Sequence, residues 1–61
     1  MGRVMCVGGP ADSQPSMSTA PEGEQIRVEV NGQVWSYRLT GTIVQKSGQS
    51  YRVAEYIGPY L

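Results

Sequence analysis

One hairpin restricts the fold of this chain more than any other feature. Residues 25–39 read QIRVEVNGQVWSYRL, in which apolar and polar residues alternate on both sides of Asn31-Gly32. This alternation is the periodicity of a half-buried β-strand. Asn-Gly is the preferred pair for a two-residue type I′ turn, because both turn positions need a positive φ. The turn fixes the register, and the sequence therefore predicts an antiparallel hairpin with Val28 opposite Trp35.

The predicted register gives the hairpin one apolar face. Val30 then lies opposite Gln33 and Ile26 opposite Tyr37, and opposed residues of antiparallel strands share a face. The apolar face holds Ile26, Val28, Val30, Trp35, Tyr37 and Leu39. The opposite face holds Arg27, Glu29, Val34, Ser36 and Arg38. The alternation in each strand separately places its apolar residues on the same face, and this agreement supports the hairpin.

A third strand follows the hairpin. Gly41 interrupts the second strand, and a glycine inside a strand is typical of a bulge or a sharp bend. The stretch SYRVAEY, residues 50–56, has strand character, and Gly58-Pro59 ends it because proline cannot donate to a ladder. The predicted fold class is therefore all-β: a small three-stranded antiparallel meander with an extended N-terminal arm and an apolar C-terminal tail.

Two loop lengths compete between the second and third strands. A three-residue loop over residues 46–48 places Ile43 opposite Tyr51, whereas a two-residue loop places Val44 opposite Tyr51. We prefer the three-residue loop, because it adds Ile43, Tyr51 and Val53 to the apolar face. The difference matters because a slip of one residue moves every side chain of a strand to the other face.

Residues 1–24 have a different composition. Between residues 7 and 24, Val7 is the only branched or aromatic apolar residue. Such a composition cannot bury enough surface to offset the entropy of ordering. We therefore divide the chain into a flexible or partner-ordered arm over residues 1–24 and a small β-meander domain with a C-terminal tail over residues 25–61. Met17 could also be a natural start, so residues 1–16 are either native or an upstream extension.

The residue types present argue against catalysis and metal binding. The chain has no histidine and a single cysteine, Cys6, so it has neither an intrachain disulfide nor a paired Cys/His zinc pattern. Ser36, Ser47 and Ser50 have no candidate base to activate them. We expect no enzyme activity, no catalytic or metal-binding residue and no cofactor. No apolar run approaches the roughly 18 residues that span a bilayer, so we expect no membrane contact and a cytoplasmic location, or incorporation in a virion assembled there.

A three-stranded sheet leaves its apolar face uncovered, whereas a domain normally needs two packed layers. We therefore expect the chain to dock on a protein partner or to form a homo-oligomer. The leading hypothesis is a non-enzymatic protein-interaction module, a small accessory or structural subunit of a larger assembly such as a phage virion. The tail could be a partner contact or a lid over the sheet, and we favour the contact. The expected partner-binding residues are Trp35, Tyr37, Tyr56, Ile57, Tyr60 and Leu61.

Two alternatives remain open. In the predicted register Arg27, Arg38 and Arg52 project from the face opposite Trp35, and small β proteins bind single-stranded nucleic acid by combining such charges with aromatic side chains. The net charge of zero, from five basic and five acidic residues, does not by itself indicate nucleic acid. The other alternative is a small inhibitor of a host enzyme, which the sequence does not separate from the leading hypothesis.

Overall fold

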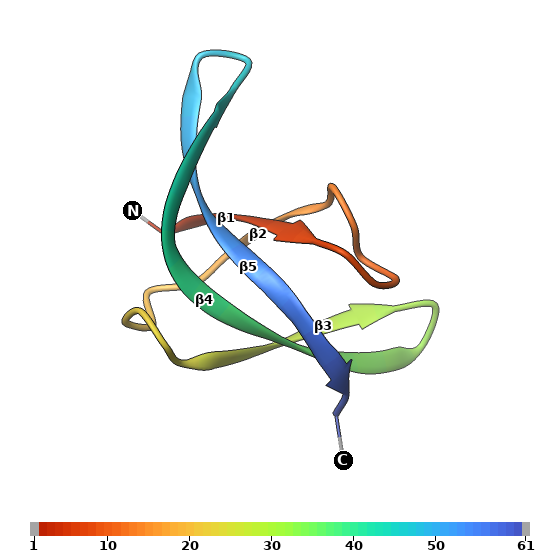
Figure 1. Ribbon diagram of the computed structural model, residues 1–61. Helices are drawn as coiled ribbons and strands as arrows, with labels where there is room; N and C mark the ends of the chain where they lie inside the picture. Colours follow the sequence, from red (N-terminus) through yellow and green to blue (C-terminus); the bar gives the residue numbers. More distant parts are fainter. Residues whose placement is uncertain (1, 61) are drawn as a thin grey trace.

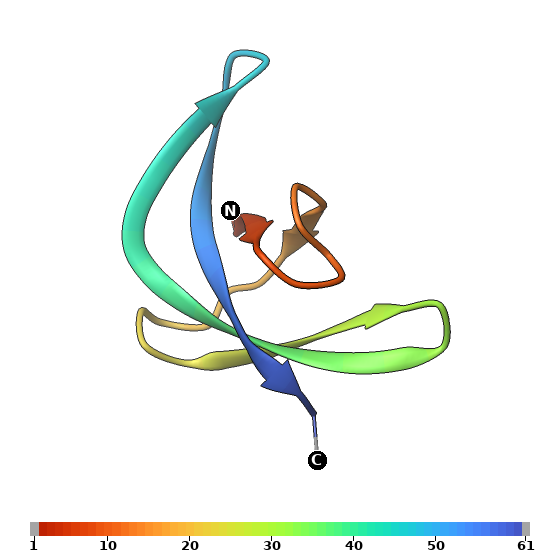
Figure 2. The ribbon, with the colours of Figure 1, turned by 45° about the vertical axis from the view of Figure 1, so that its right-hand side comes forward.

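The computed structural model describes residues 2–60, and over this range the protein is all-β (Figure 1). Its five strands are β1 (Arg3–Val7), β2 (Pro15–Met17), β3 (Gln25–Val30), β4 (Gln33–Lys46) and β5 (Gln49–Pro59). They form one mixed sheet in the order β2-β1-β5-β4-β3. The long β4–β5 pair is strongly curved, so that the sheet is nearly a barrel and β1 and β2 face the β3–β4 hairpin (Figure 2).

The β3–β4 hairpin confirms the register that the sequence predicts. Val28 pairs with Trp35, and Ile26 pairs with Tyr37. Asn31 and Gly32 have φ values of 53° and 79°, so both turn positions are left-handed, as a type I′ turn requires. The apolar face is also as predicted: the β3 valines and isoleucine pack against the buried core together with Trp35. The alternating pattern and the turn pair were enough to place every residue of this hairpin.

The β4–β5 pairing contains the predicted irregularity but not the preferred loop. The register shifts between Leu39 and Ile43, on either side of Gly41. The turn has two residues, Ser47 and Gly48, with φ values of 53° and 75°, so it resembles the first turn in its geometry. Val44 therefore pairs with Tyr51, and the prediction of a three-residue loop is wrong.

Because the loop is one residue shorter, the side chains of β5 lie on the faces of the sheet opposite to the predicted ones. Ile43 pairs with Arg52 and is 56% exposed, so it adds nothing to the core. Arg52 instead lies on the same face as Val4, its partner on β1, and Ala54 takes the core position beside Leu39. This is the expected effect of a one-residue change in register.

Residues 3–17 do not form an arm. β1 runs parallel to β5, with Val4 beside Arg52 and Cys6 beside Ala54, and β2 pairs antiparallel with β1. The predicted meander is thus present as β3–β4–β5, but it is part of a five-stranded sheet, and the predicted boundary at residue 24 does not separate an arm from a domain. Composition failed here because three consecutive residues, at positions 4–6, are buried within an otherwise polar stretch.

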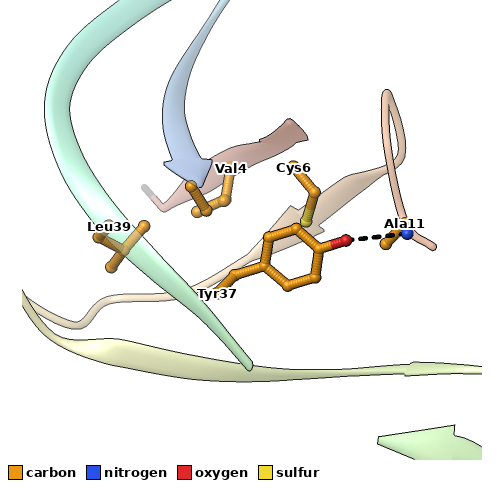
Figure 3. Packing of buried hydrophobic residues seen from close by; sticks show 6 residues of the cluster. Val4, Cys6, Ala11, Tyr37 and Leu39 are labelled. Atoms are coloured by element: carbon orange, nitrogen blue, oxygen red, sulfur yellow. Dashed lines mark hydrogen bonds between the residues drawn. The ribbon is translucent and has the colours of Figure 1, made fainter. Parts of the chain in front are cut away.

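The core lies on the inner side of the curled sheet, where β1, β4 and β5 each contribute buried residues, and it is completed by the loop that follows β1 (Figure 3). Its fully buried residues are Val4, Cys6, Ala11, Tyr37, Leu39 and Ala54. The N-terminal segment therefore supplies the second layer that the three-stranded sheet lacks. The expectation of an uncovered apolar face is wrong for this reason.

Candidate functional site

The C-terminal end of β5 carries three exposed large side chains. Tyr56 is 37% exposed, Ile57 is 42% exposed and Tyr60 is 49% exposed. Their backbone stays beside β4, because Pro59 pairs with Trp35 and the N–H of Tyr60 donates to the carbonyl of Val34 at 3.1 Å. This end of the chain thus extends the sheet and does not fold back as a lid. We call Tyr56, Ile57 and Tyr60 the β5-end patch.

A bulge distributes the patch over both faces of the sheet. Tyr56 pairs with Tyr37 and Gly58 pairs with Ser36, so Ile57 is the extra residue. The Tyr56 ring lies on the core side, 5.4 Å from the Tyr37 ring between centroids. Tyr60 lies on the outer side, where the guanidinium of Arg27 stands 5.1 Å from its ring centroid. A bulge of this kind re-aims side chains at the end of a strand.

The loop after β1 supports the inner half of the patch. A Cβ on Gly9 would lie 2.5 Å from Cδ1 of Tyr56, and Gly9 has a positive φ of 66°, so only glycine fits against the ring. Trp35 stands 6.2 Å from Tyr56 between ring centroids and is partly buried. Its indole Nε1 is buried without a hydrogen-bond partner among residues 2–60. Trp35 therefore backs the patch and does not form an open aromatic groove.

Tyr37 belongs to the core and not to an interface. Its side chain is fully buried. Its hydroxyl accepts a hydrogen bond from the N–H of Ala11 at 2.9 Å (Figure 3). The same hydroxyl donates a hydrogen bond to the carbonyl of Gly8 at 2.7 Å. Burial raises the pKa of the Tyr37 phenol, so it stays neutral. The prediction that Tyr37 contacts a partner is wrong, and Leu61 lies outside the described residues.

The three arginines do not share one face. Arg27 and Arg38 lie on the outer face as predicted, and Arg38 pairs across the strands with Glu55. Arg52 lies on the core side, where its guanidinium donates to the carbonyls of Ala20 at 2.7 Å and Ser18 at 2.9 Å. Arg52 therefore holds the segment between β2 and β3 in place, and its prediction as part of an outer arginine face is wrong.

Neither a pocket nor a metal-binding cluster occurs among residues 2–60. Cys6 is fully buried, and burial raises the pKa of its thiol, which keeps the sulfur protonated and unreactive. In the same range, no helix is long and apolar enough to span a membrane. The β5-end patch itself consists of exposed aromatic and aliphatic groups, with Arg27 as a neighbouring cation.

Sequence reasoning missed the backbone groups that hold the side chains of Tyr37 and Arg52 in place. The backbone carbonyls of Gly8, Ser18 and Ala20 accept the bonds that fix Tyr37 and Arg52, and carbonyl positions leave no trace in composition. One signal was present: Gly8-Gly9 directly follows an apolar run, and both residues have positive φ. A Gly-Gly pair in that place is typical of a tight turn after a strand.

Comparison with known proteins adds no identification. No protein-family model matches the sequence, and no curated protein or solved structure is significantly similar to it.

Proposed function

We propose that this protein is a non-enzymatic protein-interaction module, an accessory or structural subunit of a larger assembly such as a virion, and that it binds its partner through the β5-end patch. The observation that carries the proposal is the exposure of Tyr56, Ile57 and Tyr60, which lie within residues 56–60 at the end of β5 and directly after it. Tyrosine is enriched in the buried centres of protein interfaces, and tyrosine side chains often carry much of the binding energy.

The patch is held in place before any partner arrives. Chain ends usually fray and are polar, whereas here the backbone hydrogen bond to Val34 and the stacking of Arg27 on Tyr60 fix the outer half. The inner half rests on Trp35 and Gly9. A surface that is already ordered loses little conformational freedom on binding, and this favours affinity.

The charges around the patch favour a protein over a nucleic acid. Arg27 is the cation that lies against the patch, and Glu29 lies two residues from it on the same face of β3. Arg38 lies opposite Glu55, and Arg52 is engaged by backbone carbonyls. A phosphate backbone needs several free cations along its path, whereas an apolar protein surface with a carboxylate near Arg27 matches this arrangement.

The proposal is tested by affinity capture from the native host with tagged full-length protein. The test variant is Ile57→Asp combined with Tyr60→Ala, which leaves the core-facing Tyr56 ring in place. The matched control is Ile43→Asp, because Ile43 is also an exposed aliphatic residue but lies near the β4–β5 turn.

We expect the wild type and the Ile43→Asp control to recover the same stoichiometric partner, and the double variant to lose it. Recovery of that partner by all three proteins would contradict the proposed surface. Recovery of nucleic acid, with an affinity that falls steeply with salt, would favour the arginine-based alternative instead.

A further inference from the structure

The two edges of the sheet differ in their capacity to pair with another strand. β2 is one edge, and it is only three residues long and begins with Pro15, which has no N–H to donate. β3 is the other edge, and its six residues contain no proline. No strand lies beyond β3 among residues 2–60 (Figures 1 and 2). An edge of this kind presents a row of unpaired backbone groups.

The hydrogen-bond ladder between β3 and β4 determines which backbone groups of β3 have no partner within the described residues and point to the open edge. The N–H of Leu39 donates to the carbonyl of Glu24, so the odd-numbered residues of β4 turn their backbone groups toward the β3 side. The carbonyl of Val34 accepts from Tyr60 on the β5 side, which agrees with this alternation. Since Ile26, Val28 and Val30 pair with odd-numbered residues of β4, the backbone groups of Arg27 and Glu29 point to the open edge.

The side chains of β3 are self-complementary about Val28. Arg27 precedes it and Glu29 follows it on the outer face, and Ile26 and Val30 flank it on the core face. In an antiparallel pair of two β3 strands centred on Val28, each arginine lies opposite the glutamate of the other strand. Opposite charges directly across a strand pair are favourable and like charges are unfavourable.

The backbone groups select the same register. The free groups of Arg27 and Glu29 then form hydrogen-bonded pairs with Glu29 and Arg27 of the second strand, and Val28 meets its own counterpart as a non-bonded pair. The two neighbouring registers that also satisfy the ladder place Arg27 opposite itself or Glu29 opposite itself. Both bring like charges together, so the register centred on Val28 is the one that hydrogen bonding and charge favour jointly.

We propose that the free edge of β3 binds a second copy of this chain, forming a two-fold symmetric dimer in which the sheet continues from one copy to the other through antiparallel β3 strands centred on Val28. The half-buried Ile26, Val28 and Val30 of each copy then extend one apolar layer across the junction. This interface uses the edge of the sheet opposite to β2 and leaves Ile57 uncovered. The dimer and the β5-end patch share Arg27, whose guanidinium also stacks on Tyr60, but the dimer rests on the backbone edge of β3 and the patch on exposed side chains at the end of β5.

The test uses charge reversal and measures association by sedimentation velocity from micromolar to millimolar concentration. Arg27→Glu and Glu29→Arg each place like charges opposite each other in both cross-strand pairs. We expect each variant alone to dimerise at least about tenfold more weakly than the wild type, because two favourable pairs become unfavourable. We expect an equimolar mixture of the two variants to recover dimer as a heterodimer, because each introduced charge then faces its opposite.

The matched controls are Arg38→Glu and Glu55→Arg, which change net charge equally on the same outer face but lie opposite each other within one chain. We expect both to dimerise as the wild type does. Amide spectra of all four variants establish that each is folded. A wild type that stays monomeric throughout the range, a mixture that stays monomeric, or controls that dissociate like the test variants would overturn the proposal. Failure here would leave the capture experiment on Ile57 and Tyr60 unaffected, so the two proposals are separable.

Discussion

Residues 25–39 and residues 3–17 both form strands of the sheet, but their sequences specify those strands in different ways. The first region forms the β3–β4 hairpin, and its partners are joined by the two-residue turn at Asn31-Gly32. The second region forms β1 and β2, and β1 pairs with β5 from the opposite end of the chain, Val4 with Arg52. A strand whose partner is adjacent in the sequence can be predicted from its alternating pattern and its turn. A strand whose partner is distant in the sequence is held in place by packing, which the local sequence does not show.

One side chain joins the two regions. Tyr37 comes from the hairpin, and its hydroxyl bonds with backbone groups of Gly8 and Ala11 in the loop after β1. Outside both regions, Arg52 of β5 holds the segment between them by donating to the carbonyls of Ser18 and Ala20. These bonds couple the N-terminal segment to the hairpin. Substitutions in either region should therefore show how strongly the two depend on each other.

The largest effect is expected from a charge on β1. Val4→Asp places a carboxylate in a fully buried site without a partner. A buried, unpaired charge costs several kcal/mol, a large part of the roughly 5 kcal/mol or more that stabilises a small domain. We expect loss of the folded amide spectrum and of the cooperative thermal transition.

The control for this charge is Val7→Asp, on the same strand at a position that is 47% exposed. We expect it to lower the free energy of unfolding by at most about 1 kcal/mol, because the site is half-exposed and the new carboxylate meets the like charge of Glu55, its partner on β5. If Val4→Asp were as stable as Val7→Asp, β1 would have no part in the core.

A smaller effect is expected at the connection between the regions. Tyr37→Phe removes the hydroxyl and leaves the buried N–H of Ala11 without its acceptor. An orphaned buried donor costs about 1–3 kcal/mol, which denaturant unfolding measures directly. Tyr51→Phe is the control, because its hydroxyl bonds only the exposed side chain of Gln49, at 3.3 Å. Equal stability of both phenylalanine variants would mean that the loop after β1 does not depend on Tyr37.

The smallest effect is expected at the hairpin turn. A Cβ on Gly32 would meet no atom within 4 Å, so Gly32→Ala introduces no clash and only forces a side chain into the left-handed region. That conformation costs about 1–2 kcal/mol for a residue with a Cβ. Gly58→Ala is the control, because Gly58 has equal space and no positive φ. A destabilisation by Gly58→Ala that equals the effect at Gly32 would remove the turn from the explanation of the register.

The hairpin could be predicted from the sequence, whereas the β4–β5 register and β1 could not. The hairpin was predictable because two patterns and one turn pair agreed. The β4–β5 register was not predictable, because Ile43 and Val44 are both apolar and each loop length places one of them opposite Tyr51. β1 did carry a signal, since the run Val-Met-Cys-Val is continuously apolar, as expected of a parallel strand buried on both faces. Its five residues were too few to outweigh the polar composition that follows.

Tyr56, Ile57 and Tyr60, which the sequence analysis assigns to partner binding, are exposed, and their contact with a partner stays a prediction. Tyr37 could not be assigned to the core from sequence, because alternation places it on the apolar face whether that face meets a partner or the chain itself. The loop after β1 decides that Tyr37 belongs to the core, because backbone groups of this loop bond its hydroxyl. No local sequence pattern predicts that the loop lies near Tyr37.

The central claim is that the N-terminal segment and the hairpin unfold together, and native-state amide hydrogen exchange tests it most directly. The N–H of Cys6 donates to the carbonyl of Gln14 in the first region, and the N–H of Leu39 donates to the carbonyl of Glu24 beside the hairpin. Amides that exchange only through global unfolding report the same free energy of opening. The account predicts equal values for Cys6 and Leu39. Rapid exchange at Cys6 with full protection at Leu39 would contradict it.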